Sequence, residues 1–185
     1  MTTKTNDNVK PPYLGGFIYD VRCILQKSNS ILLVVDNEVL DDYSKYYFSI
    51  HTKATKRPIK NPYHESINSW MIMKRPAMNC LKQKWKDFIK WFVNEQGYSN
   101  LHIEKCEISQ TIYYPTNRRH DIDNSVPKFV LDGLVESGMI VDDDSKHITK
   151  LTLQCNIDKN HPRTEIKILI SDDLNETPRN PISFR

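Results

Sequence analysis

The sequence predicts a single α+β domain in which a mixed or largely antiparallel sheet packs against two main helices. The chain has 185 residues, a length typical of one domain, and no internal repeat or linker indicates a second one. Two segments carry apolar residues at helical spacing, and several shorter segments carry the alternating pattern of strands. Hydrophobic residues make up 38% of the chain, which is enough to form a buried core.

Two main helices are predicted in the middle of the chain. The first is expected over residues 77–96, between Pro76 near its start and Gly97 at its end. The second is expected over residues 125–137, with Ser125 as its N-cap. The apolar face of the first helix recurs at helical spacing and consists of Leu81, Trp85, Phe88, Ile89, Phe92 and Val93.

Strands are expected in the remaining apolar segments. Residues 101–114 alternate clearly, because Ile108, Ile112 and Tyr114 fall on one face of an extended chain. Further strands are expected over residues 16–26, 30–40 and 46–52, and a hairpin is expected from residues 148–158 and 164–171.

The two ends of the chain are more polar than its middle. Residues 1–45 are predicted to be an N-terminal extension, with a polar leader and a possible hairpin. Residues 46–171 are predicted to form the main domain, and residues 172–185 a polar C-terminal tail.

Hydropathy and cysteine spacing exclude several classes of protein. No apolar run approaches the roughly 18 residues that a membrane helix needs, and no secretory signal is recognisable, so a cytoplasmic protein with no membrane partner is expected. Cys23, Cys80, Cys106 and Cys155 lie far apart and form no CxxC pair, which argues against a zinc site and predicts reduced thiols.

Basic residues concentrate in the middle of the chain. Lys82, Lys86 and Lys90 recur every four residues, so they share one outer face of the predicted helix and could follow a phosphate backbone. Lys56 and Arg57 lie in a basic, proline-containing loop and are further candidates for DNA contacts. An ordinary solvated lysine face is the alternative for this pattern.

Acidic residues gather further along the chain. Asp121 and Asp123 flank one residue, and in extended chain such carboxylates point to the same side, where they repel unless a proton or a cation lies between them. A run of three aspartates at residues 142–144 follows the second predicted helix. We expect the strand, helix and return step to bring this run beside Asp121 and Asp123. Three carboxylates select a hard ion, Mg²⁺ or Mn²⁺, which is the usual arrangement for phosphodiester hydrolysis.

At this point the sequence resembles a known family, the RusA-type Holliday junction resolvases. The family pattern is R-x-D-x-D-N, a lysine, a D-x-L step on a helix, a glycine and an apolar-D-D. The matching residues are RHDIDN at 119–124, Lys128, LDGL at 131–134, Gly138 and IVDD at 140–143.

The resemblance implies a homodimeric, Mg²⁺-dependent endodeoxyribonuclease that resolves four-way DNA junctions. It assigns the metal ligands to Asp121, Asp123 and Asp143, with Asp142 as the alternative if the register slips by one residue. It assigns the essential catalytic lysine to Lys128. All four of these groups are therefore expected to be catalytic.

Two features leave alternatives open. Lys128 lies five residues after Asp123, whereas the family has four, so the turn before the helix must absorb the extra residue. Arg118 and Arg119 precede the carboxylates and are candidates for binding the scissile phosphate, or else belong to a solvated turn. The alternatives for function are a nuclease for flaps or forks, and a protein that binds branched DNA without cutting it.

Overall fold

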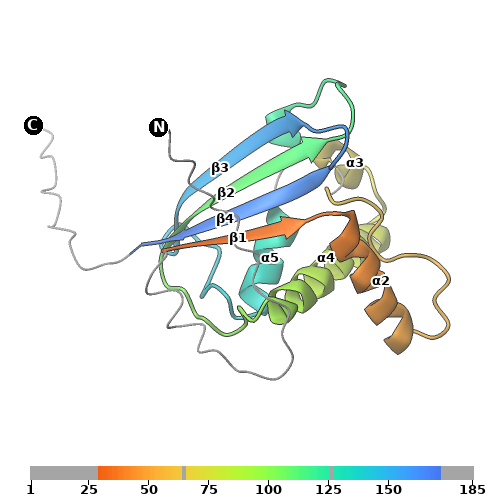
Figure 1. Ribbon diagram of the computed structural model, residues 1–185, viewed down its shortest axis with the longest axis horizontal. Coiled ribbons are helices and arrows are strands. Elements are labelled where there is room, and N and C mark those ends of the chain that lie inside the picture. Colours follow the sequence, from red (N-terminus) through yellow and green to blue (C-terminus); the bar gives the residue numbers. More distant parts are fainter. Residues whose placement is uncertain (1–28, 64–65, 126, 172–185) are drawn as a thin grey trace, which may run out of the picture.

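A computed structural model describes residues 29–63, 66–125 and 127–171, and it confirms the predicted α+β fold (Figure 1). The described chain forms one small domain with a four-stranded mixed sheet and four α-helices. The elements, in chain order, are β1 (Ser30–Val35), α2 (Asn37–Ile50), α3 (Ile67–Met71), α4 (Arg75–Glu95), β2 (Cys106–Tyr114), η1 (Ile122–Asn124), α5 (Lys128–Glu136), β3 (Ile148–Ile157) and β4 (Arg163–Ile170).

The sheet has the strand order β1-β4-β2-β3. β2 pairs in parallel with β3 and antiparallel with β4, and β1 pairs antiparallel with β4. The predicted hairpin of the last two strands is therefore wrong, because β2 lies between β3 and β4. The crossover through α5 places β3 along one edge of β2, and β4 pairs with the other edge of β2, between β2 and β1.

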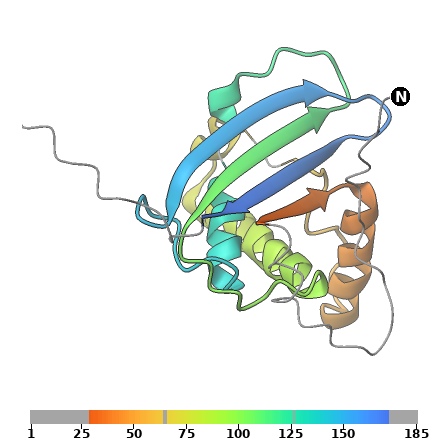
Figure 2. The same ribbon diagram turned by 60° about the vertical axis from the view of Figure 1, so that its left-hand side comes forward.

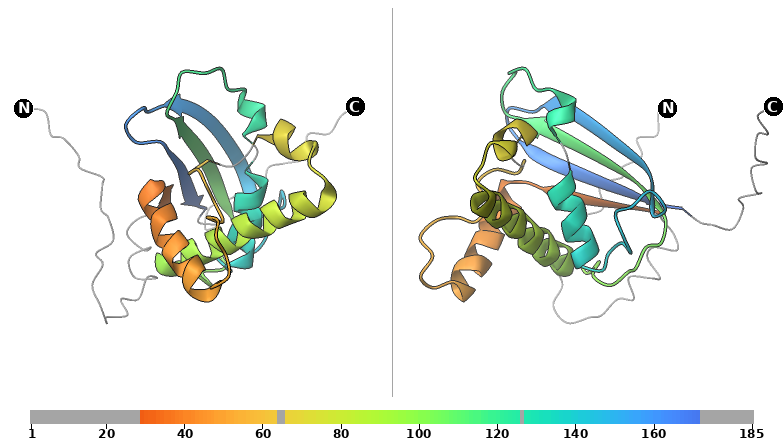
Figure 3. Two further views of the ribbon diagram at one scale, coloured as in Figure 1. Left: turned by 90° about the vertical axis from the view of Figure 1, so that its right-hand side faces the viewer. Right: turned by 180° about the vertical axis from the view of Figure 1, so that it is seen from behind.

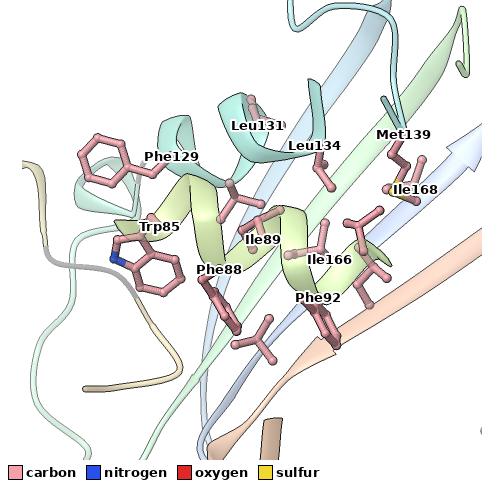
Figure 4. Packing of buried hydrophobic residues seen from close by; sticks show 14 of the residues in the cluster. Trp85, Phe88, Ile89, Phe92, Phe129, Leu131, Leu134, Met139, Ile166 and Ile168 are labelled. Atoms are coloured by element: carbon pink, nitrogen blue, oxygen red, sulfur yellow. The ribbon is translucent and has the colours of Figure 1, made fainter. Parts of the chain in front are cut away.

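α4 and α5 cover one face of the sheet (Figures 2 and 3). In β2, alternate residues from Cys106 to Tyr114 are buried, which confirms the predicted inward face. The buried side chains of α4 include five of its six predicted apolar residues, and Leu81 is only partly buried. These side chains meet those of α5 and of the sheet in one core (Figure 4).

The two predicted helices are confirmed, with changes at their ends. α4 is followed by Gly97, whose φ of 75° is the left-handed conformation expected at a helix end. The N-cap position of α5 is Pro127, not Ser125. The preceding residues form the 3-10 turn η1, in which the backbone N–H of Ser125 donates to the carbonyl of Ile122. Ser125 therefore ends this turn, and α5 begins three residues later, at Lys128. The Ser125 hydroxyl is buried and lies 3.4 Å from the hydroxyl of Tyr114.

Residues 36–50 differ most from expectation. The predicted strand over residues 30–40 ends at Val35, and the Asp36 carboxylate caps α2 by accepting from the Val39 N–H at 3.0 Å. The predicted strand over residues 46–52 is wrong, because residues 46–50 continue α2. Packing decides this, since Tyr43 contacts Phe88 of α4 with 5.0 Å between ring centroids.

The predicted N-terminal extension takes part in the domain. Residues 30–45 contribute β1 and most of α2 to the sheet and the core. The predicted strand over residues 16–26 and the tail at residues 172–185 lie outside the described residues. In the described ranges, no helix combines the length and apolar character required to cross a bilayer. The cysteines of these ranges, Cys80, Cys106 and Cys155, are free thiols, and Cys23 lies outside them.

Candidate functional site

Asp121 and Asp123 lie together after the carboxyl end of β2. Both are exposed, and Asp123 belongs to the 3-10 turn η1. The Arg119 guanidinium donates from Nε to Asp121 Oδ1 at 3.2 Å. The His120 ring stacks on Tyr114 with 3.6 Å between centroids, which ties this segment to the last residue of β2. The turn therefore presents two carboxylates and a guanidinium to solvent.

Asp143 lies elsewhere. It lies five residues before Ile148, the first residue of β3, which pairs with Cys106 at the start of β2. Asp121 and Asp123 follow the other end of the same strand. A nine-residue strand spans about 26 Å between its first and last Cα atoms. Figures 1 and 3 show the two loops at opposite ends of the β2–β3 pair.

The expected gathering of three carboxylates is therefore wrong for a single chain. A parallel crossover returns the chain to the beginning of the neighbouring strand, not to the end of the strand that it left. Asp121, Asp123 and Asp143 do not bring their carboxylate oxygens within ligand range of one common ion in the described structure. Within one chain, these residues do not fit the Mg²⁺ site that the family resemblance implies.

One other group of ligand atoms does come together. Side-chain atoms of Asp142, Asp144 and His147 lie within 4.8 Å of one another, all in the turn before β3. Asp144 Oδ1 accepts from the Lys146 N–H at 2.9 Å and lies 2.6 Å from His147 Nδ1. The hydrogen bond with His147 is the main cause that lowers the pKa of Asp144. The hydrogen bonds of Asp144 cap the turn before β3, and they account for the closeness of these side chains without a metal ion.

Lys128 is the first residue of α5. Its Nζ lies 3.6 Å from Asp132 Oδ1, one helical turn further on, so the ammonium points along α5 and not back toward η1. Lys82 of α4 reaches the same carboxylate, with 2.8 Å between its Nζ and Asp132 Oδ2, an ion pair without hydrogen-bond alignment. Asp132 is 15% exposed and links both lysines. The four-residue spacing between Lys128 and Asp132 on one helix is a sequence signal for this pair.

The predicted lysine stripe on α4 is largely paired with α5. Lys82 contacts Asp132, and Lys86 donates to Glu136, which raises the pKa of Lys86. Lys90 is exposed and lines an open hollow between α2 and α4. Two of the three lysines thus have carboxylate partners within the domain, which reduces the charge they can offer to DNA.

A second cationic surface lies on the other side of α4. We call it the basic groove, a hollow of about 420 Å³ between residues 56–63 and the first half of α4. Lys56 and Lys60 are exposed at its edge, and Lys84, which sequence reasoning missed, is half-buried in its wall. Arg57 also lines the groove but pairs with Asp41 at 2.7 Å. Lys84 stands outside the four-residue stripe, and only the fold of residues 56–63 brings the other cations to it.

Contacts among three aromatic rings link the basic groove to the turn at residues 121–124, which we call the carboxylate turn. Tyr63 lines the groove and lies 5.1 Å from Tyr114, measured between ring centroids. Tyr114 in turn stacks on His120, the residue before Asp121. The groove and the two carboxylates therefore occupy neighbouring parts of the surface.

No protein-family model matches this chain, and no curated protein matches it. Its function is therefore inferred from its own residues and their placement.

Proposed function

We propose that this protein is a metal-dependent endonuclease that cuts branched DNA, with four-way junctions as substrate and paired phosphodiester hydrolysis by a homodimer as reaction. The observation that carries the proposal is the ordered run from Arg119 to Asp143 on a strand–helix–strand unit. Two carboxylates follow β2, a lysine opens α5, and an aspartate pair precedes β3. Several independent elements in the family's order are hard to explain by chance.

The residues of the carboxylate turn have separable roles in this proposal. Arg119 offsets the negative charge of Asp121, and with the exposed Arg118 it binds a phosphate of the DNA backbone. Lys128 stabilises the negative charge that develops on the phosphate, which requires its ammonium to leave Asp132. Asp121 and Asp123, with Asp143 of a second copy, would hold Mg²⁺, or Mn²⁺ in its place, and the ion would supply an activated water.

The homodimer would also complete each metal site. Within one chain the carboxylates lie at opposite ends of β2. A second copy can place its own Asp143 beside Asp121 and Asp123. A four-way junction needs two symmetric cuts, and a two-fold dimer supplies two equivalent sites. In this arrangement each site takes two carboxylates from one subunit and the third from its partner.

Cleavage of end-labelled DNA in Mg²⁺, with binding measured in Ca²⁺, tests the activity. The wild type should cut four-way junctions, whereas D121N and D123N should bind them and not cut. D42N is the matched control, because Asp42 is an exposed aspartate on α2 that pairs with Lys45. Preferential cutting of flaps or forks would indicate the other nuclease, and binding without cutting would indicate the non-cleaving protein.

Mixing of inactive subunits tests the shared site. D123N and D143N should each be inactive alone. If the site is shared, a mixed dimer has one complete site, in which the D143N subunit supplies Asp121 and Asp123 and the D123N subunit supplies Asp143. After mixing and re-equilibration, the two variants together should therefore nick junctions. If each site lies within one chain, both sites of the mixed dimer are defective and no nick appears. Wild type mixed with D123N confirms that subunits exchange.

A further inference from the structure

We infer that the basic groove and an apolar tip beside it form the surface that recognises the branch point, where they hold an unpaired nucleotide and unstack the neighbouring base pair. This inference rests on the proposed function and adds the DNA feature that is recognised. The apolar tip consists of Met71, the last residue of α3, and Ile72, which follows it.

The charge of the groove matches a DNA backbone. Lys56, Lys60 and Lys84 line it, and no carboxylate is among its lining residues in the described chain. In that part of the chain none of these three lysines forms an ion pair, in contrast to Lys82 and Lys86. Three adjacent cations without acidic partners attract phosphate and make the binding dependent on salt.

The inner surface of the groove is apolar and suits a base. Ala77 and Leu81 of α4 and Met73 contribute to it, and Tyr63 stands at its edge. The cavity volume of about 420 Å³ falls in the range of roughly 300–1,000 Å³ typical of sites for small organic groups. A nucleotide has an apolar base face and an anionic phosphate, which is the combination that this groove offers.

The apolar tip is unusually exposed. Ile72 is 87% exposed and Met71 is 66% exposed, more than any other large hydrophobic residue of the described chain. Lys74 and Arg75, which follow after Met73, are also exposed. Single exposed hydrophobic residues are common, but apolar side chains flanked by cations are what proteins insert between base pairs to unstack them.

The tip is held firmly and lies at the end of the molecule that carries Asp121 and Asp123. Trp70, directly before it, packs against Phe129 of α5 with 5.7 Å between ring centroids. The Met73 N–H donates to the Trp70 carbonyl at 3.1 Å, which closes the turn. Figure 3 shows α3 beside η1 from two sides. A branch point at the tip would therefore lie next to the carboxylates.

The test uses a four-way junction with 2-aminopurine at the crossover, bound in Ca²⁺ so that no cutting is needed. Binding of the wild type should raise the fluorescence, because 2-aminopurine brightens when it is unstacked. I72S should bind but lose most of this rise, and K84A should lower both the affinity and the salt slope, the latter by about one unit for one lost phosphate contact. Controls are I50S and K45A, since Ile50 is 56% exposed and Lys45 is exposed, both on α2.

Two results would overturn the inference. One is a wild type that cuts junctions while I72S and K84A behave as their controls do. The other is I72S that changes from dimer to monomer in sedimentation, which would make the tip a subunit interface. Failure of the proposed function is distinguishable, because it appears as a wild type that does not cut in Mg²⁺. Fluorescence changes in such a protein would support branch recognition without cleavage.

Discussion

Replacement of Gly133 by alanine tests how closely α5 packs against α4. A Cβ atom at this position would lie 2.6 Å from Ile89 Cβ and 2.8 Å from Ile89 Cγ2. Ile89 is fully buried and branched at Cβ, so its side chain cannot rotate out of the way. The two helices must move apart to relieve the contact. Glycine in a helix is unfavourable by itself, and this close approach is the reason to find it here.

The expected magnitude follows from two opposing contributions. Overpacking of a core costs about 1–3 kcal/mol, and alanine in place of glycine in a helix returns up to about 1 kcal/mol. We therefore expect Gly133→Ala to lower the free energy of unfolding by about 1–2 kcal/mol. With a urea dependence of about 2 kcal/mol per molar, the midpoint should fall by roughly 0.5–1 M.

Urea unfolding followed by circular dichroism measures this change, and a second variant sharpens it. Ile89→Ala removes two of the three atoms that clash, Cγ1 and Cγ2, and alone should cost about 2–5 kcal/mol. The double variant should cost less than the sum of the two, because only the contact with the Cβ atom of residue 89 then remains to be relieved. A midpoint for Gly133→Ala equal to or above that of the wild type would refute the reasoning, as would full additivity.

Three further outcomes are expected. Lys128→Ala should bind metal and junction but lose most of its turnover, with Lys45→Ala as the control in the same cleavage assay; normal cutting by Lys128→Ala would exclude its catalytic role and make Lys146 the next lysine to test. Iodoacetamide at neutral pH should modify the exposed Cys80 and spare Cys106, because burial raises the pKa of the Cys106 thiol to about 11, and peptide mass spectrometry separates the two. Because hydrogen bonds lower the pKa of Asp144 from 3.8, the turn before β3 should be stabilised above that pH and lose this contribution as the pH falls through the lowered pKa. Proton-detected NMR of the Lys146 and His147 amides measures that loss, which His147→Ala should move to higher pH.

The elements predicted well from the sequence are those whose signal is local. The apolar face of α4 repeats from Leu81 to Val93, about three and a half turns, and alternation in β2 continues through nine residues, so burial follows from spacing alone. Residues 46–50 show the limit of such reasoning. Their tyrosines and phenylalanine favour a strand by composition, but Tyr43 and Tyr47 pack against aromatic neighbours in a helix that Asp36 caps.

Strand pairing and charge pairing could not be read from the sequence, because both depend on the arrangement of distant segments. The alternation of β3 and β4 shows that they are strands but does not show that β2 lies between them. The spacing of Lys82 and Lys86 places them on one helix face, but their partners Asp132 and Glu136 come from α5. Local periodicity reports which side of an element is apolar, and it does not report what that side meets.

The separation of Asp143 from Asp121 and Asp123 implies that DNA binding and DNA cutting need different numbers of subunits. The basic groove, the apolar tip and the Asp121–Asp123 turn adjoin one another, so one subunit carries all that the proposed contact with a branch needs. Asp143 lies at the other end of β2, a nine-residue strand about 26 Å long, so a single subunit lacks the third carboxylate. If the third ligand comes from a partner, binding needs one chain and hydrolysis needs two. Cutting would then begin only after two subunits have assembled on the DNA, and a lone subunit bound to DNA would leave it intact.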